Sequence, residues 1–317
     1  MGAYTNPNGQ TNSLEDIKVN LTTVLDEIYT SASKTDVWKP SEGAIQQGFN
    51  GAKTVRIPTI SVDGLGKYDQ AQGFRQGQCT VGYNEYSLLH DRSESFSLDR
   101  IDVREDGGVA SAVNVMSTFM REQVVPEIDA SAISTVSTLA LGVTDHFKSG
   151  YTPSKATMLT EIMNGLQTLE DDTGIDQGYQ IFLNQKYAQN LKMSSEFSRN
   201  KDIESAGGSI NNRVTEINGN PLTYVPSARM YSAITLNDGS TKYGYEKASA
   251  GVDVVALMTA PNTAMKIVAH EISNIFTPDV NQLADATKIN YRVYYDTIVP
   301  LNKRKGLYVI TAPASSS

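Results

Sequence analysis

Residues 53–78, KTVRIPTISVDGLGKYDQAQGFRQGQ, constrain the fold of this 317-residue chain more than any other stretch. The segment begins with the apolar residues of a β-strand and continues into four glycines and four glutamines. So long a polar excursion cannot form a core of its own, because a core requires many apolar side chains. After Val62 its apolar residues are Leu65, Tyr68, Ala71 and Phe74.

The following segment, residues 80–106, predicts the return limb of a long hairpin. Its apolar residues alternate with polar ones, which is typical of strands with one buried face. A hairpin by itself is only marginally stable in water. We therefore expect this one to lie on another surface, provided by a neighbouring copy if not by its own chain. The alternation is clearest at Phe96, Leu98, Ile101 and Val103.

A helical pattern replaces the strand pattern over residues 108–141. Apolar residues recur there at spacings of three and four, with polar residues on the opposite face. Pro126 interrupts the pattern and predicts a kink or a restart of the helix. Some thirty helical residues at ~1.5 Å each span roughly 50 Å, which is longer than a small domain is wide.

The rest of the chain predicts a mixture of helices and strands. We expect a short amphipathic helix capped at Ser13, and another helix that starts at Thr152-Pro153 and ends before Gly174. Asn218-Gly219 predicts a hairpin turn. The other expected elements are buried strands at 178–185 and 252–260, short helices at 184–193 and 262–272, and two strands around the basic turn 302–306, with Tyr291 and Tyr295 on one face and Tyr294 on the other.

Composition excludes several classes of protein. With 39% hydrophobic and 20% charged residues the chain is globular. No run of 18 apolar residues predicts a membrane span, and the N-terminus lacks the features of a signal peptide, so we expect neither membrane insertion nor export by that route. The single cysteine excludes a disulfide framework. A net charge of −8 argues against a protein that binds nucleic acid through its phosphate backbone.

Few residues suggest catalysis. His270, Glu271 and Asn274 nearly form the zinc motif H-E-x-x-H, but asparagine is a poor zinc ligand; we expect a partly exposed histidine and a solvated glutamate at a helix end. Cys79 with His90 could form a thiol and a base, although a lone cysteine is more often a small buried hydrophobe. We predict no catalytic residue, no metal site and no cofactor.

Five segments occur in a characteristic order: VRIPTI…GLGKYD…GF…G, DRSESFSLDRIDVRED, FMREQVVPEIDASAIS, EINGNPLTYVPSARM and IFTPDVNQLADATKINYRVYYDTIVPLNKRKGLYV. Together they resemble tailed-bacteriophage major capsid proteins of the Hong Kong 97 type. The resemblance covers residues 50–310 and implies an α+β fold. It implies an N-terminal arm (1–50), an extended loop hairpin (51–104), a peripheral domain with a long spine helix (105–150), an axial domain (151–275), and return strands of the peripheral domain with the C-terminus (276–317).

The resemblance further implies a virion protein that assembles in the host bacterial cytoplasm into hexamers and pentamers. These would close into an icosahedral shell around double-stranded DNA, with a separate scaffolding protein and a portal as partners. An encapsulin-like compartment or another phage structural ring protein is the alternative, and a metal-dependent hydrolase resting on His270 and Glu271 is the remote one. The inter-subunit loop contact would comprise Gly64, Gly66, Lys67, Tyr68, Gly73, Phe74 and Gly77.

Overall fold

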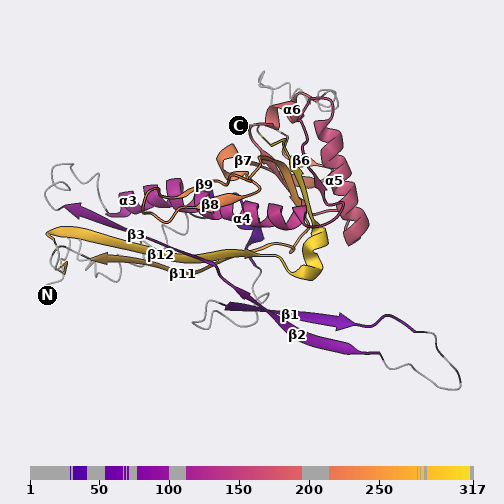
Figure 1. The fold of residues 1–317 in the computed structure, drawn as a ribbon, viewed down its shortest axis with the longest axis horizontal. Helices are drawn as coiled ribbons and strands as arrows, with labels where there is room; N and C mark the ends of the chain where they lie inside the picture. Colours follow the sequence, from indigo (N-terminus) through magenta and orange to yellow (C-terminus); the bar gives the residue numbers. More distant parts are fainter. Residues whose placement is uncertain are drawn as a thin grey trace, which may run out of the picture.

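The computed structural model has two main β-sheets joined by one long helix (Figure 1). A two-stranded ribbon of β8 (Ile234–Leu236) and β9 (Tyr245–Lys247), and a projecting hairpin of β1 (Thr54–Val62) and β2 (Cys79–Ser87), complete its described strands. The helix predicted from Ser13 lies outside the described residues. The structure describes residues 29, 31–40, 54–66, 68, 70, 77–99, 112–194, 214–276, 278, 280–281 and 284–314.

The larger sheet has six strands in the order β4-β13-β10-β5-β7-β6. The pairs β13-β4 and β5-β7 are parallel and the remaining pairs are antiparallel. The two strands predicted at 178–185 and 252–260 are β5 and β10. The strands are β4 (Phe147–Lys148), β5 (Gln180–Asn184), β6 (Glu216–Ile217), β7 (Asn220–Val225), β10 (Val254–Thr259) and β13 (Leu307–Thr311).

Helices cover both faces of this sheet, which explains why β10 reads as a continuous apolar run. Ala256 and Met258 pack with α5 (Met158–Thr173), and Leu257 between them packs with α4 (Val125–Leu141). A strand buried on both faces needs no polar alternation. Helix α5 approaches closely because Gly165 lacks a side chain: a Cβ there would lie 2.6 Å from Met258 Cε.

The helix predicted over 108–141 is confirmed from residue 112. It consists of α3 (Ala112–Phe119), the π-helix η2 (Met120–Val124) and α4. The irregularity expected at Pro126 is this π-turn. Proline cannot donate a hydrogen bond to Glu122 and its ring clashes with that carbonyl, and the wider π-turn accommodates both effects.

The same helix is long and apolar enough to cross a membrane when judged by length and composition alone. However, 67% of the apolar window found between Val113 and Leu141 is buried inside the protein. Its apolar residues are therefore used in packing, as in the core helix of a globular domain.

The smaller sheet is antiparallel and has the order β11-β12-β3, with β3 (His90–Asp99), β11 (Met265–Phe276) and β12 (Ala286–Ile298). The N-terminal half of the long helix packs on one face through Met116, Met120 and Ile128. Tyr291 and Tyr295 lie in that cluster and Tyr294 lies in the cluster on the other face, as predicted.

Three predictions about strands and helices were wrong. Residues 262–272 were expected to be a helix, but β11 begins at Met265. Because both faces of β11 are covered, its apolar residues do not alternate, and its pairing with β12 decides the conformation. The return limb of the hairpin ends at Ser87, since β3 pairs with β12 instead.

The third error concerns β12 and β13, which were expected to flank a basic hairpin turn. They belong to different sheets and are joined by a 3₁₀ helix, η4 (Leu301–Gly306). Strand β13 instead pairs with β10 and β4 in the larger sheet.

For the shorter elements, the structure agrees better with the predictions made from the sequence. Asn218 and Gly219 have φ of 52° and 75° and connect β6 to β7, as their left-handed preference predicts. Helix α5 ends at Gly174 as expected but starts at Met158, five residues after Pro153. Also present are η1 (Asp36–Trp38), α6 (Ala188–Lys192), η3 (Ser227–Arg229), β8 (Ile234–Leu236) and β9 (Tyr245–Lys247).

A buried carboxylate, Asp129 on α4, fixes residues 31–40 between the two sheets. It accepts hydrogen bonds from the Ser33 hydroxyl at 2.8 Å and the Thr35 hydroxyl at 2.6 Å. It also accepts from the Lys34 backbone N–H at 2.8 Å and forms an ion pair with Arg229 at 2.9 Å. Asp129 is 0% exposed, so these partners replace the water that it has lost.

Lys266 and Trp38 complete this junction. The Lys266 ammonium donates to the Ser33 and Thr35 hydroxyls at 2.8 and 2.9 Å. Burial lowers the pKa of Lys266 to about 8, although Asp129 opposes the shift. Trp38 stacks edge-on against Phe182 of the larger sheet, with ring centroids 4.8 Å apart.

We predict that Asp129→Ala lowers the free energy of unfolding by about 3–5 kcal/mol, because it leaves Arg229 and Lys266 as uncompensated buried charges. Asp129→Asn, which keeps the shape, should cost less. Urea denaturation measures both. The exposed Asp171→Ala on α5 is the matched control and should change stability by less than ~0.5 kcal/mol. Equal effects of Asp129→Ala and Asp171→Ala would contradict the assignment.

A second prediction concerns pH. The pKa of Lys266 falls from 10.5 to about 8 on folding, so between these values the unfolded chain binds more protons than the folded one. The contribution of Lys266 to the free energy of unfolding must therefore rise with pH between these two pKa values. The difference in unfolding free energy between the native chain and Lys266→Met, measured from pH 7.5 to 10, should shift in favour of the native chain. A flat or falling difference would refute the prediction.

Candidate functional site

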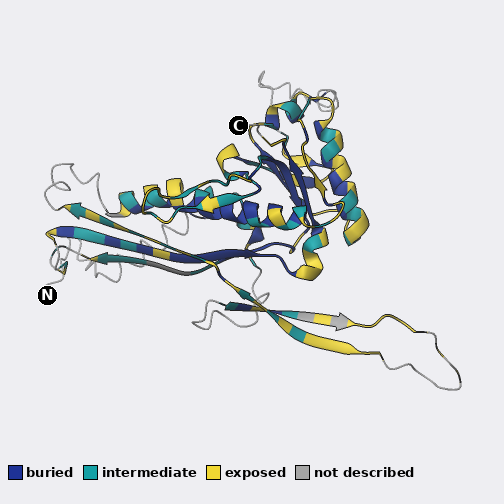
Figure 2. Cartoon of the chain, in the orientation of Figure 1, coloured by how far each residue is buried: buried dark blue, intermediate teal, exposed yellow. Residues whose placement is uncertain are grey.

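The hairpin formed by β1 (Thr54–Val62) and β2 (Cys79–Ser87) lies only partly against its own chain. Its strands pair without interruption from Thr54 with Ser87 to Val62 with Cys79. At its base, Val55 and Ile57 are buried in the apolar cluster on the face of the smaller sheet opposite the long helix. Beyond that base the hairpin extends away from the body and its side chains are mostly exposed (Figures 1 and 2).

The projecting part carries an exposed apolar face. Residues directly opposite each other in an antiparallel pair share one face of the ribbon. The pairs on this face are Pro58 with Tyr83, Ile60 with Val81 and Val62 with Cys79. Four of these side chains are 61–70% exposed: Ile60, Val62, Val81 and Tyr83. We call the six residues of these three pairs the outer face.

The outer face is the kind of surface that proteins bury against a partner. A two-stranded ribbon with one apolar face gains little stability in water. Contiguous exposed apolar side chains are also uncommon on monomeric proteins and mark sites of interaction. Within the described part of the chain, no element covers them.

Polar groups at both ends hold the ribbon in register. Arg56 and Glu85 form a cross-strand ion pair at 2.6 Å near the base. At the far end, the Gln78 backbone N–H donates to the Asp63 carboxylate at 2.8 Å. Exposed pairs of this kind contribute little to stability. Their effect is geometric, because a fixed register keeps the outer face apolar.

The predicted contact residues that the structure describes lie at the end of the hairpin, next to the outer face. Gly64, Gly66, Tyr68 and Gly77 are described, and Tyr68 is 59% exposed. Lys67, Gly73 and Phe74 lie outside the described residues. Neither Gly64 nor Gly77 has a left-handed φ, and a Cβ at Gly64 would meet no atom within 4 Å. The subunit itself therefore does not require glycine at position 64.

Sequence reasoning missed the outer face because it concentrated on the glycines. A signal was available in β1, where the apolar positions change phase. Val55 and Ile57 are odd-numbered, whereas Ile60 and Val62 are even-numbered. Because alternate residues of a strand point to opposite faces, such a change shows that both faces carry apolar residues.

The enzymatic candidates are not assembled into a site. His270, Glu271 and Asn274 lie in the strand β11, where four residues span ~13 Å, so the one-turn spacing of a helical zinc motif does not exist. The prediction of a helix end there was wrong. Cys79, expected to be buried, is exposed on the outer face. Among the described residues, no group of three potential metal ligands occurs.

The buried His146 has two hydrogen-bond partners in the described part of the chain. One ring nitrogen lies 2.6 Å from the Asp172 carboxylate and the other lies 3.0 Å from the Leu307 carbonyl. Both hydrogen-bond partners are acceptors. The hydrogen bond to His146 lowers the pKa of Asp172, with a further contribution from Lys305. Since the imidazole is buried, this arrangement ties α5 to β13.

The overall arrangement matches solved phage structures at low sequence identity. The mature capsid of bacteriophage PhiM1 is similar with a TM-score of 0.58 and 11% identity, over 84% of each chain. The capsid of cyanophage P-SCSP1u has a TM-score of 0.54 and 11% identity, also over 84% of each chain. A structure from Mycobacterium phage Che8 has a TM-score of 0.52 and 13% identity, over 88% of this chain and 90% of the other.

No family model matches the sequence, and a search of curated proteins finds no match. The similarity is therefore one of tertiary structure, and it extends over more than four fifths of the chain. The protein has the α+β fold of phage capsid subunits.

Proposed function

We propose that the protein is a major capsid protein, which assembles with identical copies into the shell of a phage head. One observation carries the proposal: in a fold shared with phage capsid structures, the described part of the chain leaves the outer face of the hairpin uncovered. A neighbouring copy supplies the missing surface. The subunit is then complete only in the assembly.

The energetics of the contact suit a closed assembly. Burying an aliphatic side chain contributes about 1.5–3 kcal/mol when it is complete. The four most exposed outer-face residues could therefore contribute several kcal/mol. Association costs roughly 4–15 kcal/mol in lost freedom, so one hairpin contact alone binds weakly. Many identical contacts around a closed shell bind strongly together.

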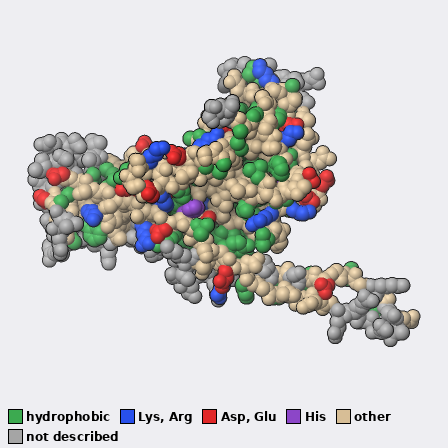
Figure 3. Space-filling model, in the orientation of Figure 1, with side chains coloured by type: hydrophobic (Ala, Val, Ile, Leu, Met, Phe, Trp, Pro, Cys, Tyr) green, Lys and Arg blue, Asp and Glu red, His purple; other side chains and the backbone are tan. Residues whose placement is uncertain are grey.

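The further parts of the proposal follow from the capsid role. Residues 1–50 act as the arm and β1-β2 as the extended loop, in hexamers and pentamers that enclose double-stranded DNA. A scaffolding protein, a portal and assembly in the host bacterial cytoplasm belong to the same proposal. The charge of −8 suits a container that does not adhere to its DNA. On the face seen in Figure 3, acidic and basic side chains are interspersed. The proposal assigns no catalytic step to the chain.

Cys79 provides a native reporter of the contact, because it is the only cysteine in the sequence and belongs to the outer face. We predict that its thiol reacts readily with a maleimide in the dissociated subunit and is protected at least tenfold in assembled particles. Reaction rates measured by mass spectrometry test this. Equal rates in both states would show that assembly leaves the outer face uncovered.

Substitution of the outer face tests the function itself. Val81→Asp places a charge on that face and should prevent regular shells, while the dissociated subunit keeps its circular dichroism spectrum and melting temperature. Thr80→Asp adds the same charge at the next, exposed position of β2, which faces the other way, and should still permit shells. Negative-stain microscopy distinguishes them. Regular shells of Val81→Asp would refute the proposal.

A further inference from the structure

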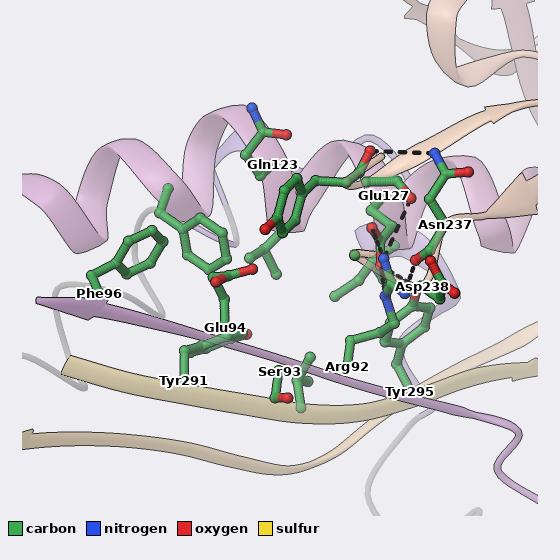
Figure 4. Close-up of a pocket in the computed structure, with 17 residues that line it drawn as sticks. Arg92, Ser93, Glu94, Phe96, Gln123, Glu127, Asn237, Asp238, Tyr291 and Tyr295 are labelled. Carbon is green, nitrogen blue, oxygen red and sulfur yellow. Dashed lines mark hydrogen bonds and ion pairs between the residues drawn. The ribbon is translucent and has the colours of Figure 1, made fainter. Parts of the chain in front are cut away.

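A pocket of about 370 Å³ lies between the long helix, the smaller sheet and the loop that joins β8 to β9 (Figure 4). It lies apart from the hairpin and from the Asp129 junction. Its volume is within the range of small-molecule sites, roughly 300–1,000 Å³. Four segments distant in sequence contribute its lining: β3, the long helix from Phe119 to Ile128, residues 237–244, and β12.

One end of the pocket is closed by Arg92, whose charge is already satisfied. Its guanidinium forms a two-point ion pair with Glu127, at 2.8 and 3.1 Å. It also donates to the backbone carbonyls of Asn237 and Gly244. The Tyr295 hydroxyl donates to Glu127 at 2.9 Å. Arg92 therefore holds the β8-β9 loop in place and leaves no free positive charge for an anionic ligand.

The other end of the pocket has aromatic walls. Phe119 of α3 packs edge-to-face against Phe96 at 4.9 Å and against Tyr291 at 5.7 Å between ring centroids. At the rim, Tyr243 from the β8-β9 loop is 73% exposed. Faces of aromatic rings carry partial negative charge and attract cations.

Glu94 places a carboxylate among these rings. It lies on β3 between Arg92 and Phe96 in the alternation, so all three point to the helix side, and Glu94, Phe96 and Phe119 all line the pocket (Figure 4). Within the described chain, the hydrogen bond that it accepts comes from the Ser95 backbone N–H at 3.2 Å. No described lysine or arginine forms an ion pair with it. A half-buried carboxylate beside aromatic faces favours a cation.

We propose that this pocket binds a primary alkylammonium group, meaning an amine on a short apolar stem. The ammonium would pair with Glu94 and lie against the aromatic walls, while the stem displaces water from the apolar lining. Of the three carboxylates that line the pocket, Glu127 is paired with Arg92 and the exposed Asp238 accepts hydrogen bonds from Ser240, so Glu94 is the carboxylate placed to receive a cation. The site is contained within one chain and does not depend on shell assembly.

The test compares two ligands of the same size with the full-length protein at pH 7. We expect 1-pentylammonium to bind at least about tenfold more tightly than the neutral 1-pentanol, as measured by calorimetry and by saturation-transfer NMR. Equal affinity for the amine and the alcohol would overturn the proposal, and so would failure of both to bind.

Variants locate the site and control for folding. Glu94→Gln keeps the shape and should remove the preference for the amine, while 1-pentanol binding is unchanged. Glu122→Gln, an exposed residue of η2 outside the lining, should keep the full preference. If Glu94→Gln still prefers the amine tenfold, the pocket is not the site.

The source of the amine is decided by a further comparison. Nα-acetyl-lysine methylamide carries the same head group and stem on a peptide unit. Tighter binding of this compound than of 1-pentylammonium assigns the pocket to a protein side chain, and weaker binding assigns it to a free amine. The outcome is independent of whether Val81→Asp forms shells, so this proposal and the capsid proposal can fail separately.

Discussion

The structure depends on one apolar helix that has to be buried by two different sheets. Its N-terminal part packs on the smaller sheet through Met116 and Met120, and its C-terminal part packs on the larger sheet through Ile133 and Val136. Neither sheet alone covers the length of the helix. The helix therefore links the cores of the two sheets.

The junction at Asp129 follows from this constraint. It lies on α4 between the two clusters, where η1, η3 and β11 meet the helix. Burying a carboxylate is costly unless it is fully paired, and Asp129 has charged and neutral partners from all three elements. Such a group contributes less to stability than to specificity, because only one arrangement of the chain satisfies all of its partners.

The hairpin shows the opposite situation, in which the described part of the chain leaves apolar side chains exposed. Val55 and Ile57 pack against apolar residues of β11 and β12, but Ile60 and Val62 remain 70% and 68% exposed. The ribbon is nevertheless held in register by Arg56 with Glu85 and by Asp63 with Gln78. An apolar surface that is preorganised in this way loses little entropy when a neighbouring copy covers it.

Local patterns in the sequence were sufficient to predict several elements of the fold. The long helix, the buried strands β5 and β10, and the Asn218-Gly219 turn could each be predicted, because one period or one residue preference dominates them. The sequence also shows that the hairpin cannot support itself. Only the tertiary structure decided that β11 is a strand, that β3 leaves the hairpin for β12, and that β13 joins the larger sheet. In these segments both faces are apolar or the partner is distant in sequence, so local periodicity carries no information about pairing. The same reason hid the outer face and the Glu94 pocket, since exposure depends on which surfaces the rest of the chain leaves uncovered.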